Sequence, residues 1–164
     1  MVEPMGALAR DARRGERLEL KVPTRAPHLP AVRAMAADLA LRMDYDLDAV
    51  EDLRLAVDEA CATLSQIAAP DAPLTVVFET SRSGLHIDAW VPTAQGVGVP
   101  RDGFGWAVLA TLVDAVEGRR STQDAVPGGD GTDAPVGVIS MDKFLHGQHP
   151  SEASGAGQNF SVAR

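Results

Sequence analysis

The sequence predicts a single domain of the α+β class, and three observations lead to this prediction. The chain has 164 residues, and its hydrophobic fraction of 45% is enough to bury one core. Segments with an apolar residue at every second position, as in a half-buried strand, occur beside segments in which apolar residues recur every three or four positions, as in an amphipathic helix. Stretches rich in glycine and proline separate these segments.

The first elements predicted are one strand and one helix. Residues 1–15 show no hydrophobic periodicity, so we expect a flexible N-terminal arm. Residues 17–22 alternate between apolar and charged side chains, which predicts a half-buried strand that Pro23 ends. Apolar residues then recur at helical spacing over 29–42, and a helix tolerates Pro30 in its first turn.

The second helix has the strongest pattern in the chain. Its apolar residues repeat by three and four, which predicts a helix whose N-cap is Asp46 or Asp48. The repeating positions are Val50, Leu53, Val57, Ala60, Leu64 and Ile67.

The second half of the chain predicts a hairpin, a third helix and a last strand. Residues 74–79 and 85–91 alternate as two strands joined by a turn at 81–84. A glycine-rich loop leads into a helix that runs through Val116 and that Gly118 stops. A polar loop then precedes a strand over 136–144.

Composition excludes several classes of function. The formal net charge of −8 argues against binding nucleic acid or an anionic membrane through bulk charge, because phosphate neutralisation requires a basic face. The single Cys61 lies in an apolar helical run and predicts a buried, inert thiol in a reducing compartment. The opening residues lack an apolar signal core, so we expect a cytoplasmic protein.

The end of the chain predicts neither structure nor a metal site. Residues 147–164 are small and polar, so we expect a disordered tail after a folded domain over 16–146. His146 and His149 have a spacing that some metal sites use, but no further ligand accompanies them. We therefore predict no metal site.

Three motifs, together with the order of the elements, carry a resemblance to a known family. They are LRLAVDEACAT over 53–63, AQGVGV over 94–99 and RDGFGWAVLATLVDAV over 101–116. From about residue 17 to 145 the chain resembles the bacterial anti-sigma factors related to serine kinases, within the GHKL or Bergerat-fold ATPase superfamily. The resemblance implies a two-layer α/β sandwich, with a mixed, mainly antiparallel sheet and about three helices on one face.

The resemblance also implies a nucleotide site in which two positions depart from the family pattern. Glu59 matches the glutamate that would take a proton from an attacking hydroxyl if the protein were a kinase. Four residues later the family has an asparagine that helps to coordinate magnesium, and this chain has Thr63. The family's adenine-binding aspartate is replaced by Ala94. We therefore expect no cofactor, with ATP and Mg²⁺ as the alternative.

The glycines of the two boxes are the remaining nucleotide-binding candidates. Gly96 and Gly98 belong to the first box, which ends shortly before Arg101 and leaves little chain for a lid over phosphates. Gly103 and Gly105 precede a helix whose N-terminal amides could hold an anion. The simpler reading is a tight loop-to-helix junction, and without the resemblance Glu59 would be a solvated carboxylate on a helix face.

The function implied by the resemblance is that of an anti-sigma factor. Such a protein sequesters an RNA polymerase sigma factor by protein contact, forms a homodimer, and is released by an anti-anti-sigma protein of the STAS type. Arg33 matches an arginine that the family uses to bind acidic protein partners. The alternatives are an active ATP-dependent serine kinase that phosphorylates an anti-anti-sigma protein, and a regulatory domain that binds another small molecule.

Overall fold

A computed structural model describes residues 15–145 of the chain. The predicted tail over 147–164, the predicted arm except Gly15, and both His146 and His149 lie outside the described residues.

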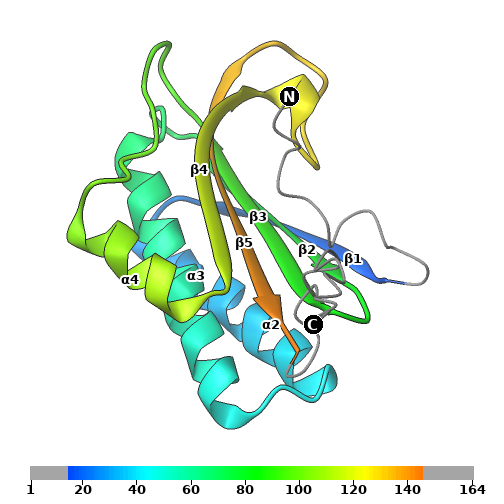
Figure 1. Ribbon diagram of the computed structural model, residues 1–164. Helices are drawn as coiled ribbons and strands as arrows, with labels where there is room; N and C mark the ends of the chain where they lie inside the picture. Colours follow the sequence, from blue (N-terminus) through cyan, green and yellow to red (C-terminus); the bar gives the residue numbers. More distant parts are fainter. Residues whose placement is uncertain (1–14, 146–164) are drawn as a thin grey trace, which may run out of the picture.

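The described residues form one antiparallel sheet with helices on one face, which confirms the predicted α+β fold (Figure 1). The strand order is β1-β2-β3-β5-β4. The strands are β1 (Arg17–Pro23), β2 (Pro73–Thr80), β3 (Gly84–Pro92), β4 (Ala115–Thr122) and β5 (Pro135–Phe144). The helices are α2 (Leu29–Arg42), α3 (Leu47–Ile67) and α4 (Phe104–Leu112), with short 3₁₀ turns η1 (Ala26–His28) and η2 (Gln123–Ala125). Every paired strand is antiparallel, so no parallel pair makes the sheet mixed.

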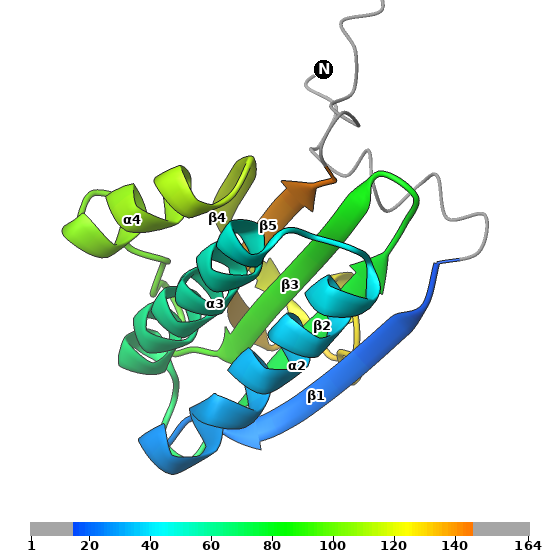
Figure 2. The same ribbon diagram turned by 90° about the horizontal axis from the view of Figure 1, so that it is seen from below.

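The core lies between the sheet and the helices, which Figure 2 shows on the same side of the strands. Alternate residues of β3, from Leu85 to Val91, point toward the helices and are almost fully buried. The matching residues of β2 and the apolar stripe of α3 pack against them. The 3.6-residue and 2-residue periodicities of the sequence therefore meet in one core.

The helix α3 begins where an aspartate caps it. The side chain of Asp46 accepts a hydrogen bond from the backbone N–H of Ala49 at 2.8 Å. Asp48 instead lies in the first turn, where its negative charge interacts favourably with the positive end of the helix dipole. Asp46 is therefore the N-cap of the two candidates.

The prediction for the third helix was wrong in its C-terminal part. Helix α4 ends at Leu112, and residues 115–122 form the edge strand β4. Gly118 is a buried residue within that strand and does not end a helix. The chain leaves the helix because the N–H of Asp114 donates to the carbonyl of Asp142 on β5, so that pairing with β5 replaces helical hydrogen bonds.

The helices of residues 15–145 pack against the sheet and contribute to the hydrophobic core. Among residues 15–145, no helix combines the length and the apolar character needed to cross a bilayer.

Candidate functional site

The structure brings Glu59 and Gly105, two of the predicted site residues, into contact. Glu59 lies on α3, and Gly105 lies in the first turn of α4. A Cβ at position 105 would be 2.0 Å from Oε1 of Glu59, so the carboxylate rests directly against the Gly105 backbone. Only glycine permits this approach. The carboxylate therefore faces the N-terminal, electropositive end of α4.

Thr63 lies one turn beyond Glu59 on α3 and is buried. The four-residue spacing places the two side chains on the same side of the helix, as the sequence predicts. The Thr63 side chain is shorter than that of asparagine, so its single hydroxyl oxygen lies closer to the helix backbone than an amide oxygen would.

The first glycine box forms a tight turn. The N–H of Val97 donates to the carbonyl of Ala94 at 3.2 Å, and Gly96 has φ of +85°. A positive φ at the third position of such a turn favours glycine. The guanidinium of Arg120, on β4, donates to the carbonyl of Gly96 at 3.4 Å, and its side chain also lies beside Gly98. These two glycines therefore contact a strand of the sheet.

Apolar side chains fill the space between this loop and the sheet. A Cβ at Gly118 would be 2.9 Å from the ring of Trp106 and 3.1 Å from Val99. A Cβ at Gly137 would be 2.6 Å from Ile67. The two strand glycines thus make room for three large side chains that pack where the glycine boxes meet the sheet.

A hollow of about 670 Å³ lies on the outer side of this packing. Its lining consists of Val99, Pro100, Arg101, Asp102, Trp106, Val116, Glu117 and Gly118. None of the predicted nucleotide-binding residues lines it. Gly103 is the N-cap residue of α4 and makes no side-chain capping hydrogen bond. A Cβ at Gly103 would meet open space, so no residue of the hollow packs against that position.

Arg33 lies apart from the glycine boxes, on the outer side of α2. Its guanidinium donates to Asp58 on α3 at 2.6 Å, and both side chains are about one-third exposed (38% and 35%). Arg33 also borders a hollow of about 460 Å³ between α2 and α3, beside the exposed Leu41. Its charge is therefore accessible but already paired.

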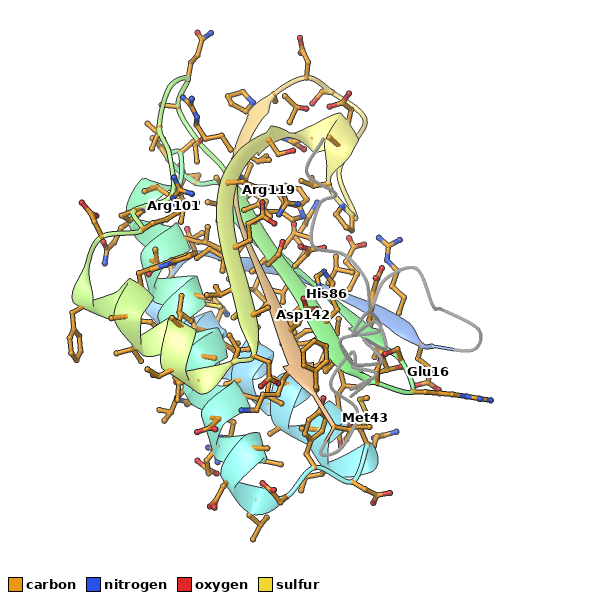
Figure 3. The ribbon with its side chains drawn as sticks, viewed as in Figure 1. Glu16, Met43, His86, Arg101, Arg119 and Asp142 are labelled. Carbon is orange, nitrogen blue, oxygen red and sulfur yellow. The ribbon has the colours of Figure 1, made fainter. Side chains whose placement is uncertain are left out.

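A buried ionic network lies on the face of the sheet that the helices do not cover, and sequence reasoning did not find it. Figure 3 shows His86 and Asp142 next to each other on β3 and β5, with Arg119 on β4. His86 Nδ1 lies 2.6 Å from Asp142 and Nε2 lies 3.1 Å from Asp88. Ser140 donates to Asp88 and accepts from Arg119 at 2.6 Å.

The network fixes the charge of His86. Burial alone would lower the pKa of His86, but the hydrogen bonds that its ring donates to Asp142 and Asp88, together with the charges of these carboxylates, raise it to about 10. Burial likewise opposes ionisation of Asp88, yet its bonds to His86 and Ser140 and the Arg119 charge lower its pKa. His86 is therefore an imidazolium at neutral pH and is not available as a general base.

Cys61 is fully buried in the core, as the sequence predicts. Burial, with a smaller contribution from the charge of Asp58, raises the pKa of its thiol to about 12. The thiol is therefore protonated and unreactive in the folded protein.

The fold and the residues around Glu59 define a class of protein. The model of the histidine kinase-like ATPase domain family matches residues 22–126, which is more than half of the chain. The chain belongs to that family.

Named relatives divide between two descriptions. The chain is 37% identical over 100 residues to an anti-sigma-F factor, RsbW, of Mycobacterium tuberculosis strain H37Rv, a match that spans 61% of this chain and 60% of the relative. It is 33% identical over 124 residues to a serine-protein kinase, also named RsbW, of Bacillus cereus strain B4264, across 63% of this chain and 78% of the relative. The chain thus spans somewhat less than two thirds of the mycobacterial relative.

The family implies ATP and Mg²⁺, and the residues present fit this group poorly. At the two positions where the resemblance expects an asparagine and an aspartate, Thr63 offers a hydroxyl and Ala94 offers no acceptor. Val99 and Trp106 pack on the sheet beside the first glycine box, and the hollow outside them does not include Glu59. We therefore derive no phosphoryl-transfer step through this site.

Proposed function

We propose that the protein is an anti-sigma factor that sequesters an RNA polymerase sigma factor by protein contact and is released by a STAS-type anti-anti-sigma protein. The family membership and the name of the mycobacterial relative support this function. We further propose that it acts in the cytoplasm as a homodimer, through a folded domain over 16–146, with an N-terminal arm and a C-terminal tail.

One observation carries the preference for binding over catalysis. The contact between Glu59 and Gly105 survives, while the groups that would hold magnesium and adenine are absent from positions 63 and 94. A carboxylate without its metal partner does not transfer phosphate efficiently, because catalysis in this chemistry depends on positioning and on neutralising charge. The scaffold keeps its shape without these groups.

Arg33 is the proposed anchor for the protein partner. An acidic partner residue has to compete with Asp58, which holds the guanidinium at 2.6 Å in the free protein. The adjacent hollow and the exposed Leu41 would receive an apolar side chain next to that charge. A charged anchor beside an apolar contact is typical of the residues that dominate protein interfaces.

We expect Arg33→Ala to weaken binding of the sigma factor by more than about 1 kcal/mol, because it removes a central charged contact. Asp58→Asn should leave binding intact or tighten it, since it removes the competing carboxylate. Calorimetric titration of purified sigma factor into each variant measures both effects.

Arg25→Ala is the matched control for this pair. Arg25 is also an exposed arginine paired with an aspartate, Asp71, at 3.7 Å, but it lies outside the hollow beside Arg33. Equal losses from Arg25→Ala and Arg33→Ala would remove Arg33 from the interface. Failure of every sigma factor of the native cell to bind would reject the anti-sigma function.

The main alternative is an active serine kinase, which the Bacillus cereus relative's name and the retained Glu59 support. Titration with Mg-ATP separates the two functions. We expect no binding at millimolar nucleotide and no transfer of labelled phosphate to an anti-anti-sigma protein. A kinase would bind Mg-ATP, and Glu59→Ala would abolish transfer while leaving binding largely intact.

The second alternative is a regulatory domain with another ligand, for which the hollow beside Val99 and Trp106 is the candidate site. Thermal stabilisation by a metabolite, and not by ATP, would favour this function.

A further inference from the structure

The exposed side of helix α4 is unusually apolar. Its sequence, FGWAVLATL, contains no charged residue, and Leu109 is its one buried residue. Phe104 is 87% exposed, and Ala107 and Thr111 on the same side are exposed as well. Positions 104, 107 and 111 share one stripe at helical spacing, with the half-buried Val108 beside them.

Helix α3 extends this apolar stripe. Glu59 meets Gly105 near the start of α4, while Lys143 joins Asp52 to the Leu112 carbonyl at the end of α4. The two helices therefore run antiparallel, and Leu55 lies between these two contacts along α3. Leu55 is 55% exposed. We call Leu55, Phe104, Ala107, Val108 and Thr111 the α3–α4 surface.

Carboxylates border the α3–α4 surface. Three of them lie on the same side of α3 as Leu55, because their spacing from it matches one or two helical turns. They are Asp48, seven residues before Leu55, Asp52, three residues before it, and Glu59, four residues after it. At the end near Leu112, a hollow of about 230 Å³ is lined by Asp46, Asp48, Ala49, Asp52, Asp114, Lys143, Phe144 and Leu145. Four carboxylates and one ammonium meet there, so the hollow attracts a cationic side chain.

We propose that the α3–α4 surface binds an amphipathic helix of a partner protein, with its apolar residues on Leu55, Phe104 and Val108 and a lysine or arginine in the acidic hollow. Charge complementarity selects this occupant. A second copy of the chain docked on this surface would set the same carboxylates against each other, so like charges would repel there. The surface is separate from the Arg33 hollow, so this inference goes beyond the proposed function and holds whatever protein Arg33 contacts.

A pair of synthetic peptides tests this proposal on the full chain. The first is a fluorescein-labelled helix of about 18 residues with leucine at every third or fourth position and lysine beside the leucines. The second has glutamate in place of each lysine. We expect fluorescence anisotropy to show binding of the lysine peptide at least about tenfold tighter than that of the glutamate peptide, and weaker at higher salt.

Surface variants then locate the binding site. Leu55→Ser and Phe104→Ser should each weaken binding of the lysine peptide about fivefold or more, and Asp48→Asn about twofold. Leu47→Ser and Asp71→Asn are the matched controls, because both residues are exposed and neither lines the acidic hollow or the Arg33 hollow. Neither control should change the affinity. Circular dichroism checks that each variant is folded.

Three results would overturn the proposal. The first is that the lysine peptide does not bind, or that it binds no more tightly than the glutamate peptide. The second is that Leu47→Ser weakens binding as much as Leu55→Ser, which would make the contact non-specific. The third is that analytical sedimentation reveals a dimer and that Leu55→Ser and Phe104→Ser dissociate it, which would assign the α3–α4 surface to self-association.

Discussion

At the scale of single residues, the buried His86 network joins charged groups of the neighbouring strands β3, β5 and β4. Two carboxylates and one imidazolium share a site in which each histidine nitrogen has an aspartate partner. Such groups stabilise a fold only when all are paired, because an unpaired buried charge carries the full cost of desolvation. The network is therefore sensitive to pH and to substitution.

We expect stability to decrease as the pH rises above about 6.5. Because the pKa of His86 is raised from 6.5 to about 10, its contribution is complete below pH 6.5 and is lost as the pH approaches 10. The lowered pKa of Asp88 adds stability that is lost as the pH falls below its ordinary value of 3.8. Urea unfolding between pH 6 and pH 10 should show a decrease on the order of a few kcal/mol.

His86→Gln tests the origin of this decrease. The variant should be less stable than the natural chain by about 3–5 kcal/mol at pH 6.5, since it leaves Asp88 and Asp142 buried without the imidazolium that pairs with both of them. Its stability should then change little up to pH 10. An equally steep decrease in the variant would show that another group titrates.

At the scale of elements, the junction of α4 and β4 depends on a glycine inside a strand. The ring of Trp106, on α4, lies over Gly118, and Val99 of the glycine-rich loop touches the same position. The helix, the loop and the edge strand therefore pack on one backbone site. This contact also closes the space beside the first glycine box.

We expect Gly118→Ala to lower the free energy of unfolding by about 1–3 kcal/mol, because the new Cβ would be 2.9 Å from Trp106 and 3.1 Å from Val99. Gly103→Ala is the matched control. A Cβ at Gly103 meets open space, so this substitution should cost less than about 1 kcal/mol, the amount by which glycine exceeds alanine as an N-cap residue. Urea denaturation measures both, and equal costs would contradict the packing described.

At the scale of the whole molecule, Cys61 reports on the core. The thiol is buried where α3 packs into the core, and its pKa is raised to about 12. Modification therefore requires the core to open. We expect a disulfide reagent at pH 8 to leave the native protein unmodified and to label the urea-unfolded chain fully.

The rate of this labelling provides the quantitative test. At low denaturant it should follow the global unfolding free energy, because α3 cannot separate from the sheet without losing the core. Rapid labelling of the native protein would show that α3 opens locally, and the burial of Cys61 would then not reflect the stability of the whole fold.

Elements with regular hydrophobic patterns were predictable from the sequence. The strand β1, the β2–β3 hairpin, the helices α2 and α3 and the strand β5 lie where the periodicity indicates, because each buries one face in the core. Glu59 and Gly105 were candidates from the resemblance, and the structure brings them together. The Arg33 assignment to a partner stays a prediction.

Pairings between distant residues were not predictable. The sequence favours a helix through Val116, because Leu109, Leu112 and Val116 have helical spacing, and the pairing of β4 with β5 overrides that local preference. His86 and Asp142 are 56 residues apart, so no local pattern indicates their contact.

The sequence alone determined the α+β class, most of its elements, the family resemblance and the identity of residues 63 and 94 as threonine and alanine, since all of these depend on local pattern or residue identity. Tertiary structure decided which residues meet: Glu59 at the start of α4, Trp106 on Gly118, Arg33 with Asp58, and the buried charges of His86 and its aspartates. The physical reason is that such contacts depend on strand register and helix packing, which join residues far apart in the chain.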